Sequence, residues 1–339
     1  MFPLAENAHA RMGEFQVVEC PPEGQMKIAI VGTGAMGSVY AALLAQGGNE
    51  VWAIDLWDEH LDAIAAKGLE ISGASGTKVV EGIRVGRDPS EAGECDLWVI
   101  GTKAADVAAA TEAILPVLTP DAMVMAFQNG LGAGERVAAH VPEEQVIVGI
   151  AEGFGSSMRG PGAVHHNGMR LIRIGELHGG VTDRVRRVED VWRASGFNVK
   201  AFADIQLMVW EKFLCNVTLS APTAAFDMTV GELMASDEAW PVAIGCMLEA
   251  HRLGVELGVS FSFDDPVAYV TEMASTIPNA SPSMRLDHLA GRPSEVDVIN
   301  GRVVDLSREH GMKAPYNQAL CAILRTREAR FDPAEARRG

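Results

Sequence analysis

Three polar side chains recur at four-residue intervals in an apolar run: Lys212, Asn216 and Ser220. In a helix this spacing advances each side chain by only about 40°, so the three would share one polar stripe. A lysine partly removed from water has a lowered pKa and can donate a proton to a substrate oxygen. We predict that Lys212 is such a donor, although a lysine reaching out to water from a helix face has the same spacing.

A second candidate for the chemistry is Glu295. Ser294 and Asp297 have the spacing of a capping box, which predicts that Glu295 lies in the first turn of a helix over 294–310. A carboxylate is favoured there by the helix dipole alone. The position therefore allows a catalytic role and a purely structural one.

The element that would bring a reaction partner to Lys212 is a glycine-rich turn. The apolar run Ile28 to Val31 is followed by three glycines, and a second run, Val51 to Ile54, ends at Asp55. A strand, a tight turn, a helix and a second strand ending in an acid are typical of dinucleotide binding. The alternative is an ordinary glycine loop with Asp55 as a helix cap. The predicted cofactor-binding residues here are Gly32, Thr33, Gly34, Ala35, Met36, Gly37 and Asp55.

Asp55 also predicts which dinucleotide binds. A carboxylate at the end of the second strand accepts hydrogen bonds from the ribose hydroxyls and repels a 2′-phosphate. The expected cofactor is therefore NAD rather than NADP.

Two further loops follow apolar runs that we predict to be strands. Lys103 comes after the run ending at Gly101, and Asn129-Gly130 comes after the run ending at Phe127. Carboxyl ends of parallel strands form the ligand-binding edge of an open sheet, so Lys103 and Asn129 are predicted to contact the cofactor. A solvated lysine and a plain Asn-Gly turn are the structural alternatives.

The order of elements predicts an α/β fold with an N-terminal Rossmann doubly wound parallel sheet and an all-helical C-terminal domain. We expect a flexible leader over 1–26, the Rossmann domain over 27–203, the helical domain over 204–332 and a tail over 333–339. A late strand over 168–175 is expected to form a hairpin with residues 163–166. The helical domain is expected to hold the substrate and to pair two chains as a homodimer.

Composition excludes several classes of protein. The chain has 339 residues, 48% of them hydrophobic, and a formal charge of -17, which disfavours a nucleic-acid partner. Its five cysteines have no paired spacing, so we expect free thiols, no metal site and a cytoplasmic protein. No apolar run is long enough to span a membrane, and the first residues do not read as a secretion signal.

Taken together, these segments resemble the ketopantoate reductase family over nearly the whole chain after the leader. The resemblance rests on the glycine turn, Lys103, Asn129-Gly130, Lys212 in Trp210-Glu211-Lys212 with Asn216, Ser283-Met284 with Asp287, and the run Glu295 to Gly301. It implies reduction of a 2-oxo acid in a cleft between two domains. It further implies that Lys212 donates the proton, that Glu295 and Asn129 fix substrate and nicotinamide, and that Asn216, Ser220 and Ser283 bind the substrate.

Two departures from the family pattern bear on the substrate. Ser220 and Val230 replace asparagines of the family, so a 2-oxo or 2-hydroxy acid other than ketopantoate is an equal expectation. The alternatives are an NAD-linked dehydrogenase of another hydroxy compound with the same fold, one that uses a histidine, and a noncatalytic NAD-responsive sensor. No histidine has an orienting carboxylate in its sequence motif, and His288 is expected at the surface.

Overall fold

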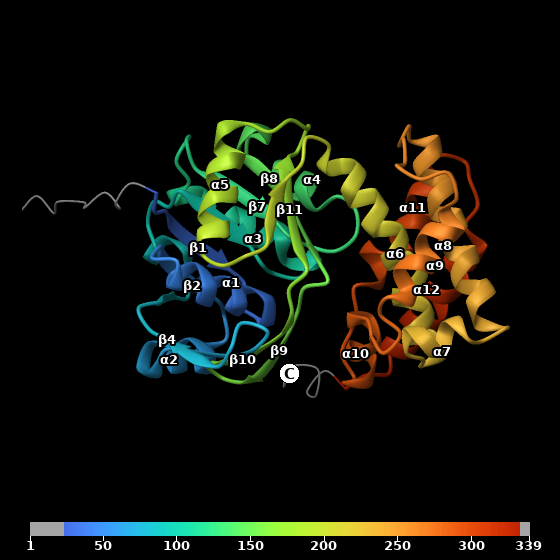
Figure 1. The fold of residues 1–339 in the computed structure, drawn as a ribbon, viewed down its shortest axis with the longest axis horizontal. Helices are drawn as coiled ribbons and strands as arrows, with labels where there is room; N and C mark the ends of the chain where they lie inside the picture. The colour runs from blue at the N-terminus through green and yellow to red at the C-terminus, as the bar shows by residue number, and fades with distance from the viewer. Residues whose placement is uncertain (1–23, 333–339) are drawn as a thin grey trace, which may run out of the picture.

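The computed structural model describes residues 24–332. The N-terminal half is built around a sheet and the C-terminal part is helical, and helix α6 (Ile205–Phe226) leads from one into the other (Figure 1). The expected leader and tail therefore lie almost wholly outside the described residues. One correction concerns Met26, which we assigned to the leader: its side chain is fully buried in the core.

The main sheet has eight strands in the order β12-β11-β8-β7-β6-β1-β2-β5. The strand β1 lies between β6 and β2, so the chain crosses to opposite sides of β1, which creates the switch point where open sheets bind ligands. The bounds are β1 (Lys27–Val31), β2 (Glu50–Ile54), β5 (Arg84–Gly86), β6 (Leu97–Ile100), β7 (Met123–Ala126), β8 (Val146–Glu152), β11 (Leu171–Glu176) and β12 (Val199–Ala201).

The sheet is not wholly parallel, which corrects one detail of the predicted fold. Strand β11 pairs antiparallel with β8 and parallel with β12. The other pairings in this sheet are parallel, as expected. The central strands β6 and β7 are buried along their whole length, as strands covered on both faces must be.

Helices cover both faces of the sheet. One face packs on α1 (Ala35–Gln46), α2 (Asp58–Lys67) and α5 (Asp183–Ala194), and the other packs on α3 (Val107–Ile114), α4 (Ala133–Ala138) and the start of α6. The doubly wound architecture is confirmed.

A second sheet of four strands was not predicted. It has the order β4-β3-β10-β9, with bounds β3 (Leu69–Gly73), β4 (Lys78–Val80), β9 (Gly155–Gly160) and β10 (Ala163–Gly168). The expected hairpin between residues 163–166 and 168–175 is wrong. Strand β10 pairs with β9 and, in parallel, with the distant β3, while β11 joins the main sheet.

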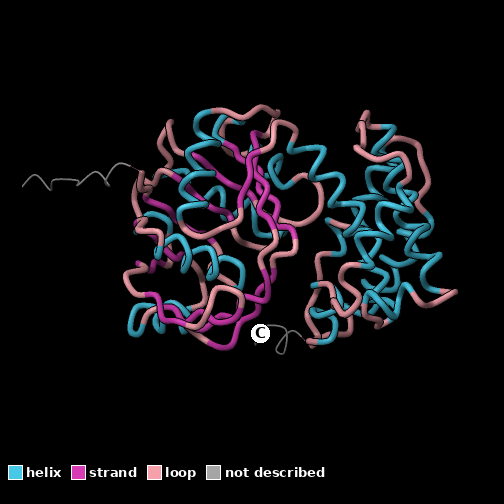
Figure 2. Tube along the Cα trace, viewed as in Figure 1, coloured by secondary structure: helices cyan, strands magenta, loops and turns pink. Residues whose placement is uncertain are grey.

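The C-terminal part is all helical over the described residues (Figure 2). Its helices are α6, α7 (Val230–Met234), α8 (Ala239–Glu256), α9 (Pro266–Ser275), α10 (Ser283–Leu289), α11 (Asn300–Glu309) and α12 (Pro315–Glu328). Helix α6 packs on α8, α9, α10 and α12, so it positions Lys212 from the centre of this domain.

The expected helix over 294–310 is also wrong at its start. Residues Val296–Val298 form a short 3-10 helix, and α11 begins only at Asn300. The predicted capping box does not form because Ser294 bonds to Glu328 and Asp297 bonds to Arg325, both on α12. Tertiary partners therefore take both of the capping side chains.

Candidate active site

The turn between β1 and α1 has the geometry of a phosphate-binding loop. Gly32 has a φ of +92°, and a Cβ there would lie 2.6 Å from the backbone nitrogen of Thr102. A Cβ on Gly37 would lie 2.3 Å from the carbonyl oxygen of Gly32. By contrast, a Cβ on Gly34 would meet no described atom within 4 Å. Gly32 and Gly37 are thus required by packing, whereas Gly34 borders open space at the N-terminus of α1, where a pyrophosphate fits.

This difference predicts opposite outcomes for two alanine variants. Gly34 has a φ of -70°, which alanine adopts without strain, so Gly34→Ala is expected to keep the melting temperature of the parent. It is expected to weaken NADH binding about tenfold, because a methyl group would enter the pyrophosphate space. Gly37→Ala is expected to lower the melting temperature. Thermal melts and NADH titrations measure both effects, and unchanged NADH affinity in Gly34→Ala would contradict this assignment.

Asp55 lies where the sequence places it, directly after β2, but it also has a local structural role. Its Oδ1 accepts hydrogen bonds from the backbone N–H groups of Leu56, at 2.7 Å, and Trp57, at 3.0 Å. One carboxylate oxygen thus fixes the turn into α2, and the second is the one available to a ribose hydroxyl. The helix-cap alternative for Asp55 is wrong, because the N-cap of α2 is Trp57 and Asp55 shapes only the turn before it.

Arg87, a cation close to Asp55, is paired with two carboxylates. Asp55 N–H bonds to the carbonyl of Gly86, which places Arg87 beside this corner. The Arg87 guanidinium contacts Asp58 at 2.5 Å and Asp62 at 2.6 Å. A 2′-phosphate would have to compete with these two carboxylates for Arg87 and would also face Asp55.

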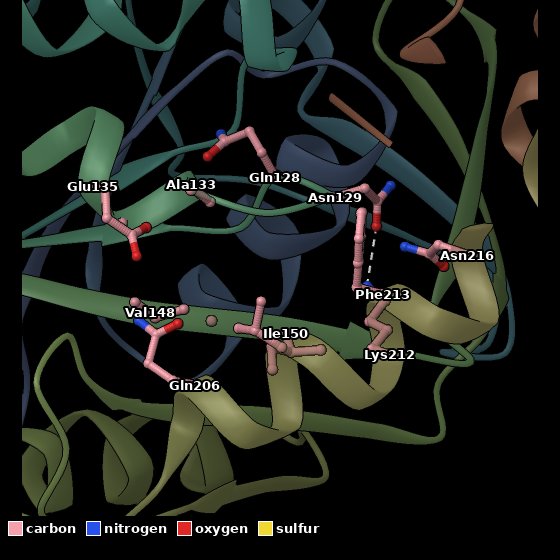
Figure 3. Close-up of a pocket in the computed structure, with 15 residues that line it drawn as sticks. Gln128, Asn129, Ala133, Glu135, Val148, Ile150, Gln206, Lys212, Phe213 and Asn216 are labelled. Carbon is pink, nitrogen blue, oxygen red and sulfur yellow. Dashed lines mark hydrogen bonds between the residues drawn. The ribbon is translucent and has the colours of Figure 1, made fainter. Parts of the chain in front are cut away.

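Lys212 and Asn129 meet at the carboxyl edge of the sheet. The Lys212 Nζ donates a hydrogen bond to Oδ1 of Asn129 at 3.0 Å (Figure 3). Asn216, one turn further along α6, lines the same cavity. Gln128, which sequence reasoning left without a role, holds this loop by donating to the carbonyls of Ile100 and Thr102.

The surroundings of Lys212 lower its pKa to about 8, because burial disfavours the ammonium form. Two carboxylates, Glu152 and Glu295, oppose the effect of burial by favouring the charge. A lysine with such a pKa holds a proton at neutral pH and releases it easily, as a general acid must. Lys212 is therefore not an ordinary solvated lysine.

Glu295 comes from the segment before α11 and touches the loop after β6. Its Oε1 accepts a hydrogen bond from the backbone N–H of Ala104 at 3.2 Å. The neighbouring Lys103 is paired with Asp287 of α10, Nζ to Oδ2, at 3.2 Å. These two contacts join the helical domain to the ligand edge of the sheet. The helical first turn that we predicted for Glu295 is wrong, since Glu295 precedes a 3-10 helix and makes no cap hydrogen bond.

Two predicted substrate-binding positions lie apart from the cavity. Ser220 is buried and Ser283 is exposed at the first residue of α10, and neither lines the cavity beside Lys212. The prediction for His288 is wrong: its side chain is only 4% exposed and bonds to Glu328 at 2.9 Å. Sequence spacing could not show this pair, because its members are 40 residues apart.

Residues 24–332 contain neither a metal-binding cluster nor a membrane-spanning helix. This part of the chain contains no cluster of three or more histidine, cysteine, aspartate or glutamate side chains arranged to hold a metal. None of its helices combines the length and the apolar character that crossing a membrane requires. The four cysteines in this range, at positions 95, 215, 246 and 321, are free and buried.

A glycine turn of the dinucleotide-binding type in one domain and a partly buried lysine on the helix entering the next are features of a pyridine-nucleotide-dependent oxidoreductase. Two family models match the chain. "Ketopantoate reductase PanE/ApbA" matches residues 28–179, and "Ketopantoate reductase PanE/ApbA C terminal" matches residues 204–328. The chain belongs to the ketopantoate reductase family.

Individual relatives agree with this assignment. A 2-dehydropantoate 2-reductase of Halobacterium salinarum is 32% identical over 300 residues, which span 88% of this chain and 98% of that protein. The crystal structure of a PanE/ApbA family ketopantoate reductase from Ralstonia eutropha JMP134 has a TM-score of 0.82 at 29% identity, covering 90% of this chain and 99% of that one. A D-mandelate dehydrogenase solved with NADH and anilino(oxo)acetate also has a TM-score of 0.82, at 25% identity, with 90% and 98% covered.

Proposed function

We propose that this protein transfers a hydride between NAD and a 2-oxo acid/2-hydroxy acid pair, with Lys212 as the proton donor and acceptor. The observation that carries the proposal is the Lys212 ammonium group, which is partly buried and hydrogen-bonded to Asn129 beside the ligand edge of the sheet. Hydride transfer to a ketone leaves an oxygen that needs a proton, and a nicotinamide cannot supply that proton.

In this proposal the cofactor-binding residues come from the Rossmann domain and most of the substrate-binding residues come from the helical domain. We propose that the Gly32 to Gly37 turn holds the pyrophosphate and that Asp55 holds the adenosine ribose. Lys103 and Asn129 would bind the nicotinamide end, where a bound cofactor supplies or accepts the hydride. Asn129 also accepts from Lys212, so this amide aligns the proton donor with the side of the substrate carbonyl that faces the cofactor.

On the substrate side, we propose that Asn216, Ser220 and Ser283 contact the acid and that Glu295 fixes its orientation. During reduction the Lys212 ammonium group gives its proton to the forming alkoxide, and during oxidation the neutral amine takes it back. The two carboxylates that favour the charge of Lys212, Glu152 and Glu295, keep the donor protonated before each reduction.

The substrate class extends beyond ketopantoate. The cavity beside Lys212 is lined by polar side chains, among them Gln128, Glu135, Gln206 and Asn216, and by the apolar side chains of Val148, Ile150, Val209 and Phe213. Apolar walls suit an aliphatic or aromatic side chain better than a hydroxylated one. A relative of similar fold, D-mandelate dehydrogenase, was solved with NADH and an aryl-bearing ligand, which supports both the cofactor and this class.

A panel assay tests the proposal. Purified protein is mixed with NADH or NADPH and a set of 2-oxo acids, including ketopantoate and aliphatic and aromatic analogues, and the loss of NADH absorbance is followed. We expect NADH-dependent turnover of at least one acid. No turnover with any acid, together with tight NADH binding, would favour the noncatalytic sensor.

We also propose that the protein is cytoplasmic and forms a homodimer through its helical domain. Several large apolar side chains of this domain are exposed, including Leu286, Leu289, Tyr316 and Ile323. Light scattering on the purified protein is expected to give twice the chain mass of 36.1 kDa. A monomer at micromolar concentration would contradict the dimer without affecting the proposed chemistry.

A further inference from the structure

A partly buried ion pair lies at the carboxyl end of β8. Oε2 of Glu152 accepts hydrogen bonds from Nε of Arg173, at 2.9 Å, and from Nη2 of the same guanidinium group. Arg170 adds a second cation, with Nη1 3.5 Å from Oε1. The Glu152 and Arg173 side chains are 27% and 25% exposed. Two hydrogen bonds from one guanidinium group fix the carboxylate in one orientation.

The strand and helix geometry places this pair beside the turn of α6 that carries Lys212. Ile150 lines the cavity together with Lys212 (Figure 3), and Glu152, two residues further along β8, lies on the same face of the strand. Arg173 is opposite Ile150 in the antiparallel pairing. Its Nη1 lies 2.7 Å from Sδ of Met208, which is one turn before Lys212 on α6.

Two carboxylates from different domains interact electrostatically with Lys212. Glu152 acts from the Rossmann domain and Glu295 acts from the helical domain, and each favours the ammonium form against the effect of burial. Facing Glu152 are Arg170 and Arg173 of the sheet region and Tyr269 of α9, and Tyr269 is hydrogen-bonded to Cys215. Burial raises the pKa of both Tyr269 and Cys215, so these two groups are neutral at physiological pH.

We infer that Glu152 is a positioning residue for the proton transfer: held by Arg173 against α6, its carboxylate keeps the Lys212 ammonium group charged in a desolvated site. The inference rests on the proposed function and extends it to a residue outside the predicted site. Glu152 touches neither substrate nor cofactor in this account. Its effect is electrostatic, and Arg173 sets its place and offsets part of its charge.

The pH profile of Glu152→Gln tests this role. Reduction requires the protonated lysine, so kcat/KM for the 2-oxo acid falls as pH rises through the Lys212 pKa. Removing a nearby negative charge destabilises the ammonium form and moves this falling limb to lower pH, by about one unit. At pH 6 the variant is expected to approach the parent rate. Glu152→Asp keeps the negative charge, so its kcat/KM is expected to fall at the same pH as that of the parent.

Glu176→Gln is the matched control. Like Glu152, Glu176 is a carboxylate of the main sheet paired with an arginine, Arg184, but it is more deeply buried and does not act on Lys212. We expect this variant to have a lower melting temperature than the parent. We expect its kcat/KM to fall at the same pH as that of the parent.

Three results would overturn the inference. In the first, the falling limb of the kcat/KM profile of Glu152→Gln stays at the pH of the parent. In the second, this limb moves equally far in Glu152→Asp and Glu152→Gln. In the third, it moves equally far in the Glu176→Gln control. If instead Lys212→Ala retained full turnover, the proposed function itself would fail. The two failures are therefore distinguishable.

Discussion

Lys212→Ala is expected to reduce kcat for 2-oxo acid reduction by about 10²–10⁴-fold, the range that a positioned general acid contributes. The variant removes the ammonium group and leaves Oδ1 of Asn129 without its donor, but it does not alter the glycine turn. NADH affinity is therefore expected to stay within about threefold of the parent value. Stopped-flow turnover and fluorescence titration with NADH measure the two quantities separately.

Lys67→Ala is a suitable control for this experiment. Lys67 is an exposed lysine in the last turn of α2, and it does not line the cavity beside Lys212. Parent-like turnover is expected. Equal losses in the two variants would point to a general effect on folding, and retained turnover in Lys212→Ala would remove Lys212 from its role.

The second large effect concerns the cofactor. The parent protein is expected to use NADH about 100-fold better than NADPH in kcat/KM, because Asp55 favours ribose hydroxyls and repels a 2′-phosphate. Arg87 does not compensate, since Asp58 and Asp62 hold it. Initial rates with both cofactors at a fixed 2-oxo acid concentration give this ratio directly.

Asp55→Asn isolates the charge from the turn. The Asn side chain keeps an oxygen that accepts from Leu56 and Trp57, so the turn into α2 persists. Loss of the negative charge is expected to lower NADH use about tenfold and to raise NADPH use. Comparable rates of the parent with NADPH and NADH would contradict NAD specificity and would indicate that Arg87 leaves its carboxylates to bind a phosphate.

Local patterns in the sequence predicted the elements that carry most of the site. The strand from Lys27 to Val31, its glycine turn and the long helix with Lys212 were predictable because apolar periodicity and glycine spacing reflect backbone geometry over a few residues. The position of Asn129 also follows from a general rule, that ligand-binding groups gather at the carboxyl edge of the sheet. Its hydrogen bond with Lys212, 83 residues away, does not follow from that rule.

The errors all involve partners distant in the chain. The start of the helix near Ser294 was misplaced because Glu328 takes that hydroxyl. The hairpin failed because β10 pairs in parallel with β3, which lies about ninety residues earlier. Glu152 was overlooked for the same reason: nothing near it in the sequence shows that Arg173 and Lys212 are its neighbours. Such contacts arise from tertiary packing, which single-sequence patterns do not encode.

The most direct test of the central claim is the pH dependence of both reaction directions in the parent and in Lys212→Ala. Burial lowers the Lys212 pKa to about 8, so reduction is expected to fall, and oxidation to rise, as pH passes through that value. The residual activity of Lys212→Ala is expected to lack both limbs. If the rates of Lys212→Ala still fell for reduction and rose for oxidation near pH 8, another group would be the proton donor and acceptor.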